Sequence, residues 1–214
     1  MSSRRSFRIP RSLGLFAVIA FTCSFLGCFS RSPNVERIIP PDREQDLLSS
    51  LQSLGGRSQE VEELVFQFVN KVREENGVPT LIYDAQVATV ARKHSEEMAL
   101  SGGLSHLSKD GKSPAERLKG SGFCWSLGED VLVLCGENVG KVYVVDTLLE
   151  NRVTRRLYDF TLKEVEEVAM EVVKGWMASE EHRGVMLDSA FRRTGVGVWF
   201  SLSERAFYIT QDFL

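Results

Sequence analysis

The side chains of this chain that could form a binding or metal site are two histidines and a glutamate. His106 and His182 each follow directly after a predicted helix, where a scaffold commonly presents functional groups. Glu137 lies beside Gly136 in a strand-like segment, where a carboxylate is costly unless it is paired. Two neutral imidazoles and one carboxylate suit a divalent metal ion, zinc above all. Spacing does not show that the three converge, and a polar loop residue is the alternative for each.

The remaining candidates point away from catalysis. His94 lies on the apolar stripe of a predicted helix, which is typical of a core histidine with one hydrogen bond. Ser105 precedes His106 directly, but chain neighbours rarely form a nucleophile–base pair, and no third orienting residue is evident. We therefore assign no catalytic residue and favour a binding site. The alternative is a metal-dependent hydrolase in which Glu137 acts as general base on a metal-bound water.

The elements that must position these residues follow from periodicity and turn signals. Helices are predicted from Val61 to Asn76, from about 85 to 100, from Ser113-Pro114-Ala115-Glu116 onward, and from about 162 to 177. Strands are predicted over 131–145, 194–202 and 206–213, the last two joined as a hairpin. This order predicts the α+β class, with helices covering an antiparallel sheet.

The first 27 residues have the pattern of an export signal. A basic stretch from Arg4 to Arg11 precedes an apolar run from Leu13 to Leu26. An uncleaved membrane anchor is the alternative, although the run is short for a spanning helix. The residues Phe25-Leu26-Gly27-Cys28 resemble a bacterial lipoprotein lipobox, which implies acylation of Cys28 and attachment to a membrane. Ordinary cleavage with an incidental Cys28 is the alternative.

We accordingly divide the chain into a signal over 1–27, a lipid-anchored tether over 28–58 with one short helix near 46–54, and a domain over 59–214. Export places Cys124 and Cys135 in a compartment that permits a disulfide between them; two buried thiols are the alternative. The formal charge of −3 includes four arginines before Cys28, so removal of the signal leaves −3 − 4 = −7. An acidic body without a dense basic stripe excludes nucleic acid as the expected partner.

Several segments, in order, resemble the CAP superfamily, whose SCP-like domains occur in cysteine-rich secretory, antigen-5 and pathogenesis-related-1 proteins and in many bacterial proteins. The similar segments are Val72–Leu81, Ala91–Ala99, Leu104-Ser105-His106, Ser113–Leu118, Gly136-Glu137-Asn138-Val139, Trp176–Arg183, Thr194–Val198 and Tyr208–Phe213. The resemblance spans about residues 60–214.

The resemblance implies an αβα sandwich with a central antiparallel sheet and a cleft lined by His106, Glu137 and His182. It also implies that the two histidines bind a divalent metal ion, and that a lipid or small molecule is a candidate ligand. The chain departs from the family at Ser179, where many members have a second cleft glutamate; Glu180 or Glu181 could replace it, although solvated charges are the simpler interpretation.

The stretch from 141 to 161 is longer than is usual in the family. It contains Arg152, Arg155 and Arg156 among apolar residues. We expect either an extra hairpin or a flap near the cleft, with a solvated insertion as the default.

Overall fold

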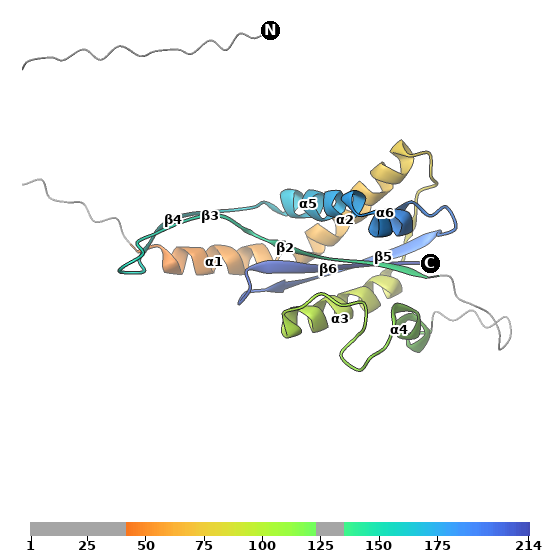
Figure 1. The fold of residues 1–214 in the computed structure, drawn as a ribbon, viewed down its shortest axis with the longest axis horizontal. Coiled ribbons are helices and arrows are strands. Elements are labelled where there is room, and N and C mark those ends of the chain that lie inside the picture. Colours follow the sequence, from red (N-terminus) through yellow and green to blue (C-terminus); the bar gives the residue numbers. More distant parts are fainter. Residues whose placement is uncertain (1–41, 123–134) are drawn as a thin grey trace, which may run out of the picture. The chain divides into compact units, whose positions relative to one another are not determined.

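A computed structural model describes residues 42–122 and 135–214 (Figure 1). The helices are α1 (Glu44–Gly55), α2 (Ser58–Glu75), α3 (Ala85–Ser101), α4 (Pro114–Gly120), α5 (Val165–Ala178) and α6 (Glu180–Leu187). The strands are β1 (Ile82–Tyr83), β2 (Gly136–Tyr143), β3 (Val145–Glu150), β4 (Leu157–Leu162), β5 (Arg193–Ser201) and β6 (Ala206–Phe213).

The main sheet has the strand order β1-β5-β6-β2, and it is antiparallel except for the short pairing of β1 with β5. Helices α3 and α4 cover one face, and α2, α5 and α6 cover the other (Figure 1). Gly195 and Gly197 lack side chains where the backbone of α3 crosses β5, because a Cβ at either position would collide with that backbone. The predicted α+β class and αβα layering are confirmed.

The predicted helix starts and stops are also observed. Asp84 caps α3 by accepting from the backbone amides of Gln86 and Val87, and Gly102 ends the helix with a φ of 76°. Ser113 and Glu116 form the expected capping box of α4. Several boundaries differ. The first predicted helix begins at Ser58 rather than Val61, and the strand predicted over 131–145 ends at Tyr143, since residue 145 already belongs to β3. The fourth predicted helix begins at 165 rather than 162, because β4 extends to Leu162.

The segment before residue 59 contributes more to the core than we expected. The short helix predicted there is α1, and its Leu47, Leu51 and Leu54 belong to the main hydrophobic core. The long stretch from 141 to 161 contains the hairpin β3–β4, which is a separate two-stranded sheet. A hydrogen bond from Arg43 N to Leu157 O joins the start of α1 to this hairpin. The structured body therefore begins N-terminal to the predicted domain boundary.

A buried arginine fixes the position of α6. The Arg73 side chain is fully buried at the end of α2. Its Nε donates to Pro79 O at 2.8 Å, and its Nη1 donates to Met186 O at 2.7 Å and Asp188 O at 3.0 Å. A longer bond joins Nη2 to Phe191 O at 3.4 Å. One side chain thus links α2 to the C-terminal end of α6.

Candidate functional site

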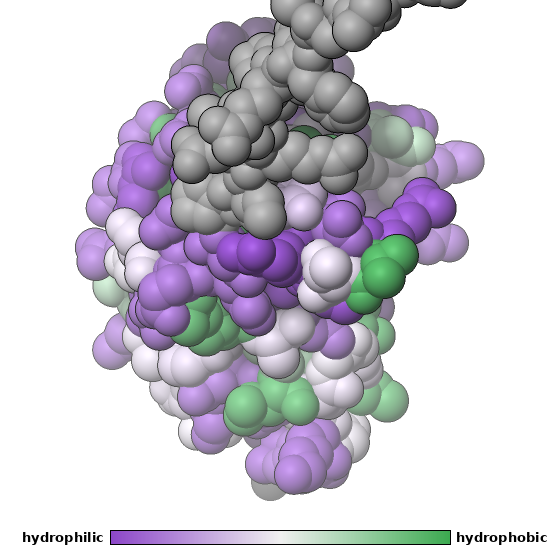
Figure 2. All heavy atoms as spheres, turned by 90° about the vertical axis from the view of Figure 1, so that its left-hand side faces the viewer, coloured by the Kyte–Doolittle hydropathy of each residue, from purple (hydrophilic) through white to green (hydrophobic). Residues whose placement is uncertain are grey.

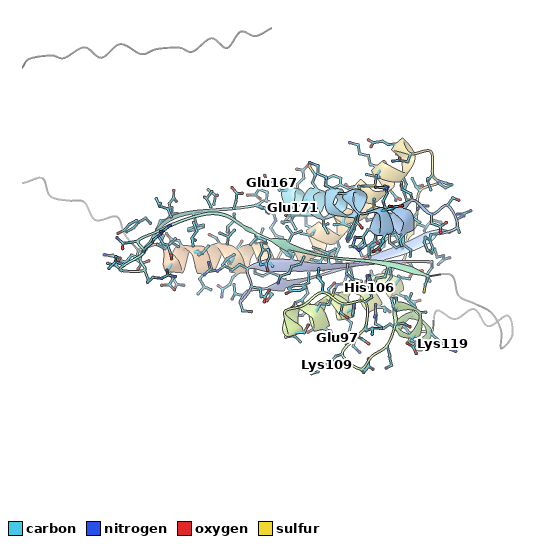
Figure 3. The ribbon with its side chains drawn as sticks, in the orientation of Figure 1. Glu97, His106, Lys109, Lys119, Glu167 and Glu171 are labelled. Atoms are coloured by element: carbon cyan, nitrogen blue, oxygen red, sulfur yellow. The ribbon has the colours of Figure 1, made fainter. Side chains whose placement is uncertain are left out.

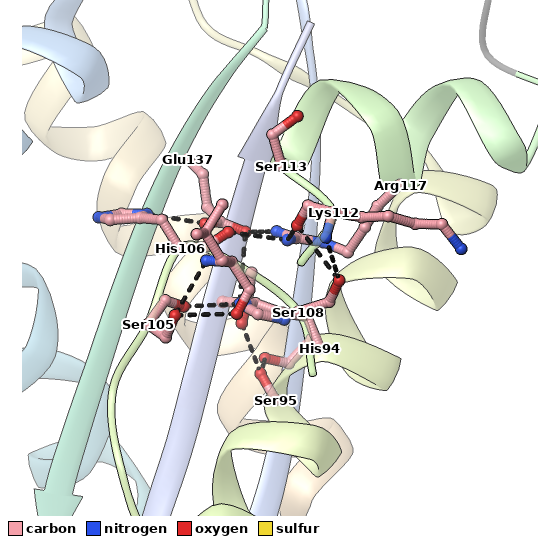
Figure 4. Close-up of polar contacts among 12 residues, drawn as sticks. His94, Ser95, Ser105, His106, Ser108, Lys112, Ser113, Arg117 and Glu137 are labelled. Carbon is pink, nitrogen blue, oxygen red and sulfur yellow. Dashed lines mark hydrogen bonds and ion pairs between the residues drawn. The ribbon is translucent and has the colours of Figure 1, made fainter. Parts of the chain in front are cut away.

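The structure brings two of the predicted site residues into direct contact. Glu137 lies on β2, with its side chain on the face of the sheet covered by α3 and α4, and this side chain is 1% exposed. His106 lies in the loop between α3 and α4, and its Nδ1 is 2.7 Å from Glu137 Oε1 (Figure 4). Figure 3 shows His106 on the α3–α4 side of the sheet. Because a carboxylate only accepts, His106 Nδ1 is the donor of this bond.

Arg117 is one of two residues of this cluster that were not predicted from the sequence. It projects from α4, and its Nη2 donates to Glu137 Oε2. Its Nη1 donates to the carbonyls of His106 at 2.9 Å and Lys112 at 3.1 Å. Glu137 is therefore held between an imidazole and a guanidinium, which is the pairing that its buried position required. The capping box predicted the start of α4, and Arg117 is one residue beyond it, but nothing local indicated the partner.

His94 is the buried structural histidine that its place on the α3 stripe predicted. Its side chain is 1% exposed, and its Nε2 lies 2.7 Å from Ser105 O. A carbonyl only accepts, so Nε2 carries the proton and Nδ1 of the neutral ring is an acceptor. Burial, followed by the charge of Arg117, lowers the pKa of His94 and favours this neutral form. The Ser105 hydroxyl donates to Leu107 O at 2.8 Å and accepts from Leu107 N at 3.0 Å, so its proton is held by a backbone carbonyl and not by a histidine.

His182 lies inside a helix, and the expected loop position was wrong. It is the third residue of α6, where Ser179 Oγ accepts a bond from its backbone amide at 3.4 Å. The carbonyl of His182 accepts from Asn138 Nδ2 at 3.1 Å. Asn138 is the neighbour of Glu137 on the edge strand β2, so this strand connects both predicted histidines.

The two histidines have opposite shifts in pKa. The hydrogen bond to Glu137 raises the pKa of His106, and the negative charge of Glu181 adds to this. Burial lowers the pKa of His182, and a positive charge on His106 lowers it further. Glu180 and Glu181 are themselves exposed, as the simpler interpretation predicted.

Asp212 adds a second buried carboxyl group beside Glu137. It is the cross-strand partner of Glu137 on β6, and it is fully buried. Among the residues that the structure describes, no donor group reaches either carboxyl oxygen of Asp212, whereas its protonated form can donate a hydrogen bond to Glu137. Burial and the negative charge of Glu137 raise the pKa of Asp212 well above its usual range, so the group retains a proton at pH values where other aspartates are ionised.

Unpartnered buried polar atoms gather around this cluster. Within the described ranges, the buried side-chain atoms without a partner are His94 Nδ1, Arg117 Nε, Asn138 Oδ1, Gln211 Oε1 and both carboxyl oxygens of Asp212. The atoms of His94, Arg117 and Asp212 lie on the α3–α4 face with Glu137, whereas Asn138 and Gln211 are the neighbouring residues on β2 and β6, and their side chains point to the opposite face. A cavity of about 260 Å³ between α3 and α4 is lined by His94 and Arg117 and by polar side chains of both helices. Glu137, His106 and His182 are not among its lining residues, so this cavity lies beside the candidate site.

The residues present suit only a weak metal site. In the part of the chain that the structure describes, no three His, Cys, Asp or Glu side chains come together as a set that could hold a metal ion. His106 and His182 supply imidazole donors, and the Glu137 bond orients the first of them as carboxylates do for metal-bound histidines. Two protein ligands are fewer than the three or four of well-formed zinc sites.

Two predictions concern residues outside the described ranges. Cys28 and Cys124 both lie there, so acylation of Cys28 and the disulfide between Cys124 and Cys135 stay predictions. Cys135 lies directly before β2 and is partly buried. Among the described helices, none combines the length and apolar character needed to cross a membrane.

Comparison with known proteins identifies the family. The sequence profile of the Cysteine-rich secretory protein family (CAP) matches residues 66–213. The chain belongs to the CAP family. This CAP domain is 29% identical over 153 residues to the "Uncharacterized membrane protein YlbC" of Bacillus subtilis (strain 168). The match covers 72% of the chain but only 34% of that relative, so the chain spans about a third of its length.

Solved structures share the fold of this CAP domain. An extracellular protein containing an SCP domain from Bacillus anthracis superposes with a TM-score of 0.53 at 24% identity, covering 76% of the chain and 43% of that protein. An outer surface protein from Borrelia burgdorferi has a TM-score of 0.53 at 13% identity, covering 73% of the chain and 92% of that protein. At these identities the likeness concerns the fold alone.

Proposed function

We propose that this CAP domain binds a ligand or partner through the site at His106, Glu137 and His182, and that it acts at the cell envelope after export. The observation that carries the proposal is the 2.7 Å bond between His106 Nδ1 and the buried Glu137 carboxylate. That bond fixes a half-exposed imidazole ring and leaves its Nε2 as the free nitrogen donor.

A divalent metal ion, zinc first, is the cofactor that these residues fit best. Neutral imidazole is a suitable zinc ligand, and His106 and His182 would hold the ion together. Glu137 would orient His106 and increase the basicity of its Nε2. When bound, the ion would supply a Lewis-acidic anchor for an oxygen or nitrogen atom of the ligand. Affinity is expected to be modest because the protein offers only two donors.

The geometry favours binding over the alternative, a metal-dependent hydrolase. That reaction requires Glu137 to accept a proton from a water molecule. Both oxygens of its carboxylate already accept bonds, from His106 and from Arg117, and the side chain is 1% exposed. A carboxylate engaged in this way positions other groups and is poorly placed to act as a general base.

The envelope location is supported by the predicted signal and by the relatives. The relatives are described as a membrane protein, an extracellular protein and an outer surface protein. Acylation of Cys28 would retain this chain at a membrane surface. Mass spectrometry of the mature N-terminus tests this directly: we expect a first residue Cys28 that carries acyl groups, and an unmodified start at another residue would contradict it.

Calorimetric zinc titration of the purified protein tests the site. We expect His106→Ala and His182→Ala each to remove most of the zinc affinity, and Glu137→Gln to weaken it about 10-fold or more, as is typical of a lost orienting partner. His94→Ala is the matched control: it should cost stability and leave zinc binding intact. Circular dichroism verifies that each variant is folded.

The pH dependence of zinc binding adds a second criterion. A protonated imidazole cannot bind zinc, and Glu137 raises the pKa of His106. Zinc affinity should therefore fall as the pH is lowered from 7.5 to 5.5, and the fall should begin above pH 6.5. Equal binding by His106→Ala and the wild type, or a pH-independent affinity, would end the proposal.

A further inference from the structure

The cavity between α3 and α4 is a concave feature that the site at His106, Glu137 and His182 does not use. On the face of the molecule shown in Figure 2, hydrophobic residues are scattered among a majority of hydrophilic ones, which is ordinary for a protein surface. The cavity is more specific. Its volume of about 260 Å³ lies just below the range of about 300–1,000 Å³ that is usual for drug-sized ligands. It therefore has room for a small organic molecule.

Two residues of the cavity wall carry buried polar atoms that lack a hydrogen-bond partner. His94 and Arg117 both line the cavity, and their side chains are 1% and 8% exposed. Within the described residues, nothing donates to His94 Nδ1 and nothing accepts from Arg117 Nε. A buried donor or acceptor without a partner costs about 1–3 kcal/mol. A bound molecule that supplies the missing hydrogen bonds is therefore favoured.

The free nitrogen of His94 lies on the side of the ring that faces another residue of the wall. Its Nε2 is on the opposite side, where the Ser105 carbonyl accepts its proton at 2.7 Å (Figure 4). Its Nδ1 lies 3.9 Å from Oε2 of Glu97, and Glu97 also lines the cavity. Both of these atoms are acceptors, because the ring is protonated at Nε2. This part of the wall therefore offers two acceptors to a ligand that can donate.

The hydroxyl groups of the wall add further acceptors. Those of Thr89, Ser108 and Ser121 each donate within the protein, to a backbone carbonyl or to a carboxylate. Because their protons are used in this way, these oxygen atoms accept from a ligand. A carboxylate or a phosphate, which only accepts, would meet mostly acceptors in this cavity. A ligand with several hydroxyl protons would find partners for them.

The charged side chains of the wall balance one another. The cations are Lys93, Lys112 and Arg117, and the anions are Glu97, Asp110 and Glu116. The wall therefore carries no net charge, and it favours neither an anion nor a cation as ligand. Arg117 Nε remains as a buried donor to a ligand oxygen. A hydroxyl group both donates and accepts, so a neutral ligand with several hydroxyl groups matches this wall best.

We propose that the cavity between α3 and α4 is a second binding site, and that it takes a neutral polyhydroxyl molecule of the size of a monosaccharide. One hydroxyl group of the ligand donates to His94 Nδ1, and another accepts from Arg117 Nε. Binding is weak, because each of these hydrogen bonds replaces one to water. The site is independent of metal binding at His106 and His182, although Arg117 contacts both the cavity and Glu137.

Nuclear magnetic resonance of the ¹⁵N-labelled protein, with D-glucose as the probe, tests this site. We expect a saturable shift of the His94 Nδ1 resonance at millimolar glucose, because this nitrogen gains a hydrogen bond. The ring nitrogens of His106 and His182 should stay unchanged. Sodium acetate at the same concentration tests for an anion site and should leave His94 unshifted.

Two exposed positions on α3 provide a matched pair of variants. Thr89 lines the cavity, so Thr89→Trp should fill part of it and weaken glucose binding. Gln86 is also exposed on α3 but does not line the cavity, so Gln86→Trp should keep the affinity of the wild type. Glu97→Ala removes an acceptor from the wall and should weaken binding about 10-fold or more, the loss typical of a hydrogen bond to a charged group. Circular dichroism verifies that each variant is folded.

Four outcomes would overturn the proposal. No saturable shift of His94 with glucose would mean that only water fills the cavity. An equal shift with acetate would show a site for anions, and an equal glucose affinity of Thr89→Trp and the wild type would place the sugar elsewhere. A glucose-induced shift of His106 and His182 would place it at the candidate site. Failure here leaves the zinc proposal untouched, because zinc is followed at His106 and His182.

Discussion

Two buried polar clusters of this protein differ in how completely they are paired. Arg73 donates through Nε, Nη1 and Nη2 to four backbone carbonyls, and none of its atoms is without a partner. The cluster around Glu137 contains one strong pairing with His106 and Arg117, yet Asp212 and His94 beside it carry unpartnered buried atoms. A completely paired cluster stabilises one arrangement of the chain, whereas unpartnered groups have a capacity for further bonds. The first is structural, and the second is the candidate site.

The largest expected effect comes from removing the fully paired arginine. Arg73→Ala would leave several buried carbonyls without donors and would detach α6 from α2, so we expect a loss of about 3–5 kcal/mol in the free energy of unfolding. Urea denaturation measures this loss. Arg152→Ala, at an exposed position without an ion pair, should change stability by less than about 0.5 kcal/mol. A loss below about 1 kcal/mol for Arg73→Ala would contradict the structural role.

Replacement of the buried Asp212, in contrast, should increase the free energy of unfolding. Because the pKa of Asp212 is raised in the folded protein, the folded state retains a proton that the unfolded state releases above about pH 4. Stability is therefore lost as the pH rises through this window toward the folded pKa. Asp212→Asn carries no ionisable group there and should be the more stable protein at pH 8, by about 1–3 kcal/mol.

Thermal unfolding of Asp212→Asn and the wild type from pH 4 to 8 measures this difference. The advantage of the variant should grow with pH and be small at pH 4. A variant that is less stable at every pH would show that the ionised carboxylate of Asp212 is needed.

A smaller effect is expected from His94, and here the stability falls as the pH is lowered. Burial lowers its folded pKa below the usual 6.5, so the unfolded state binds the proton first. The wild type should lose stability as the pH falls from 7 through 6.5 toward the folded pKa, by at most about 1.4 kcal/mol for each pH unit. His94→Gln should lack this loss. Chemical denaturation of both proteins at several pH values measures the difference, and parallel profiles would contradict the assignment of His94 as a buried neutral histidine.

Periodicity and turn chemistry predicted most of the fold. The stripe that carries His94, the capping box of α4 and the hairpin of β5 and β6 were predicted from local signals, and the structure confirms each. The burial of α1 was not predictable in this way, because the elements that it contacts, β5 and the β3–β4 hairpin, lie about 100 to 150 residues later in the chain. Composition identified residues 28–58 as a tether, but it could not show that three leucines there would find an apolar surface.

The candidate site was predicted only in part, again because long-range contacts leave no signal in the local sequence. A carboxylate in an apolar strand had to be paired, so Glu137 was identifiable. Arg117, which pairs with Glu137, and Asp212, which lies opposite it on β6, were not identifiable, because contacts of β2 with a short helix and with the last strand leave no local pattern. The helical position of His182 was missed because α6 follows α5 with only the cap residue Ser179 between them.

The central claim is that the incompletely paired cluster binds a ligand through His106 and His182, while His94 contributes to stability and not to the binding of that ligand. The chain has only three histidines, so the imidazole nitrogen resonances of the ¹⁵N-labelled protein can be followed individually during a zinc titration at pH 7.5. The account predicts that His106 and His182 shift together at one stoichiometry, while His94 keeps the resonances of a neutral ring protonated at Nε2. A shift of His94 with the others, or a response from only one of the two site histidines, would contradict it.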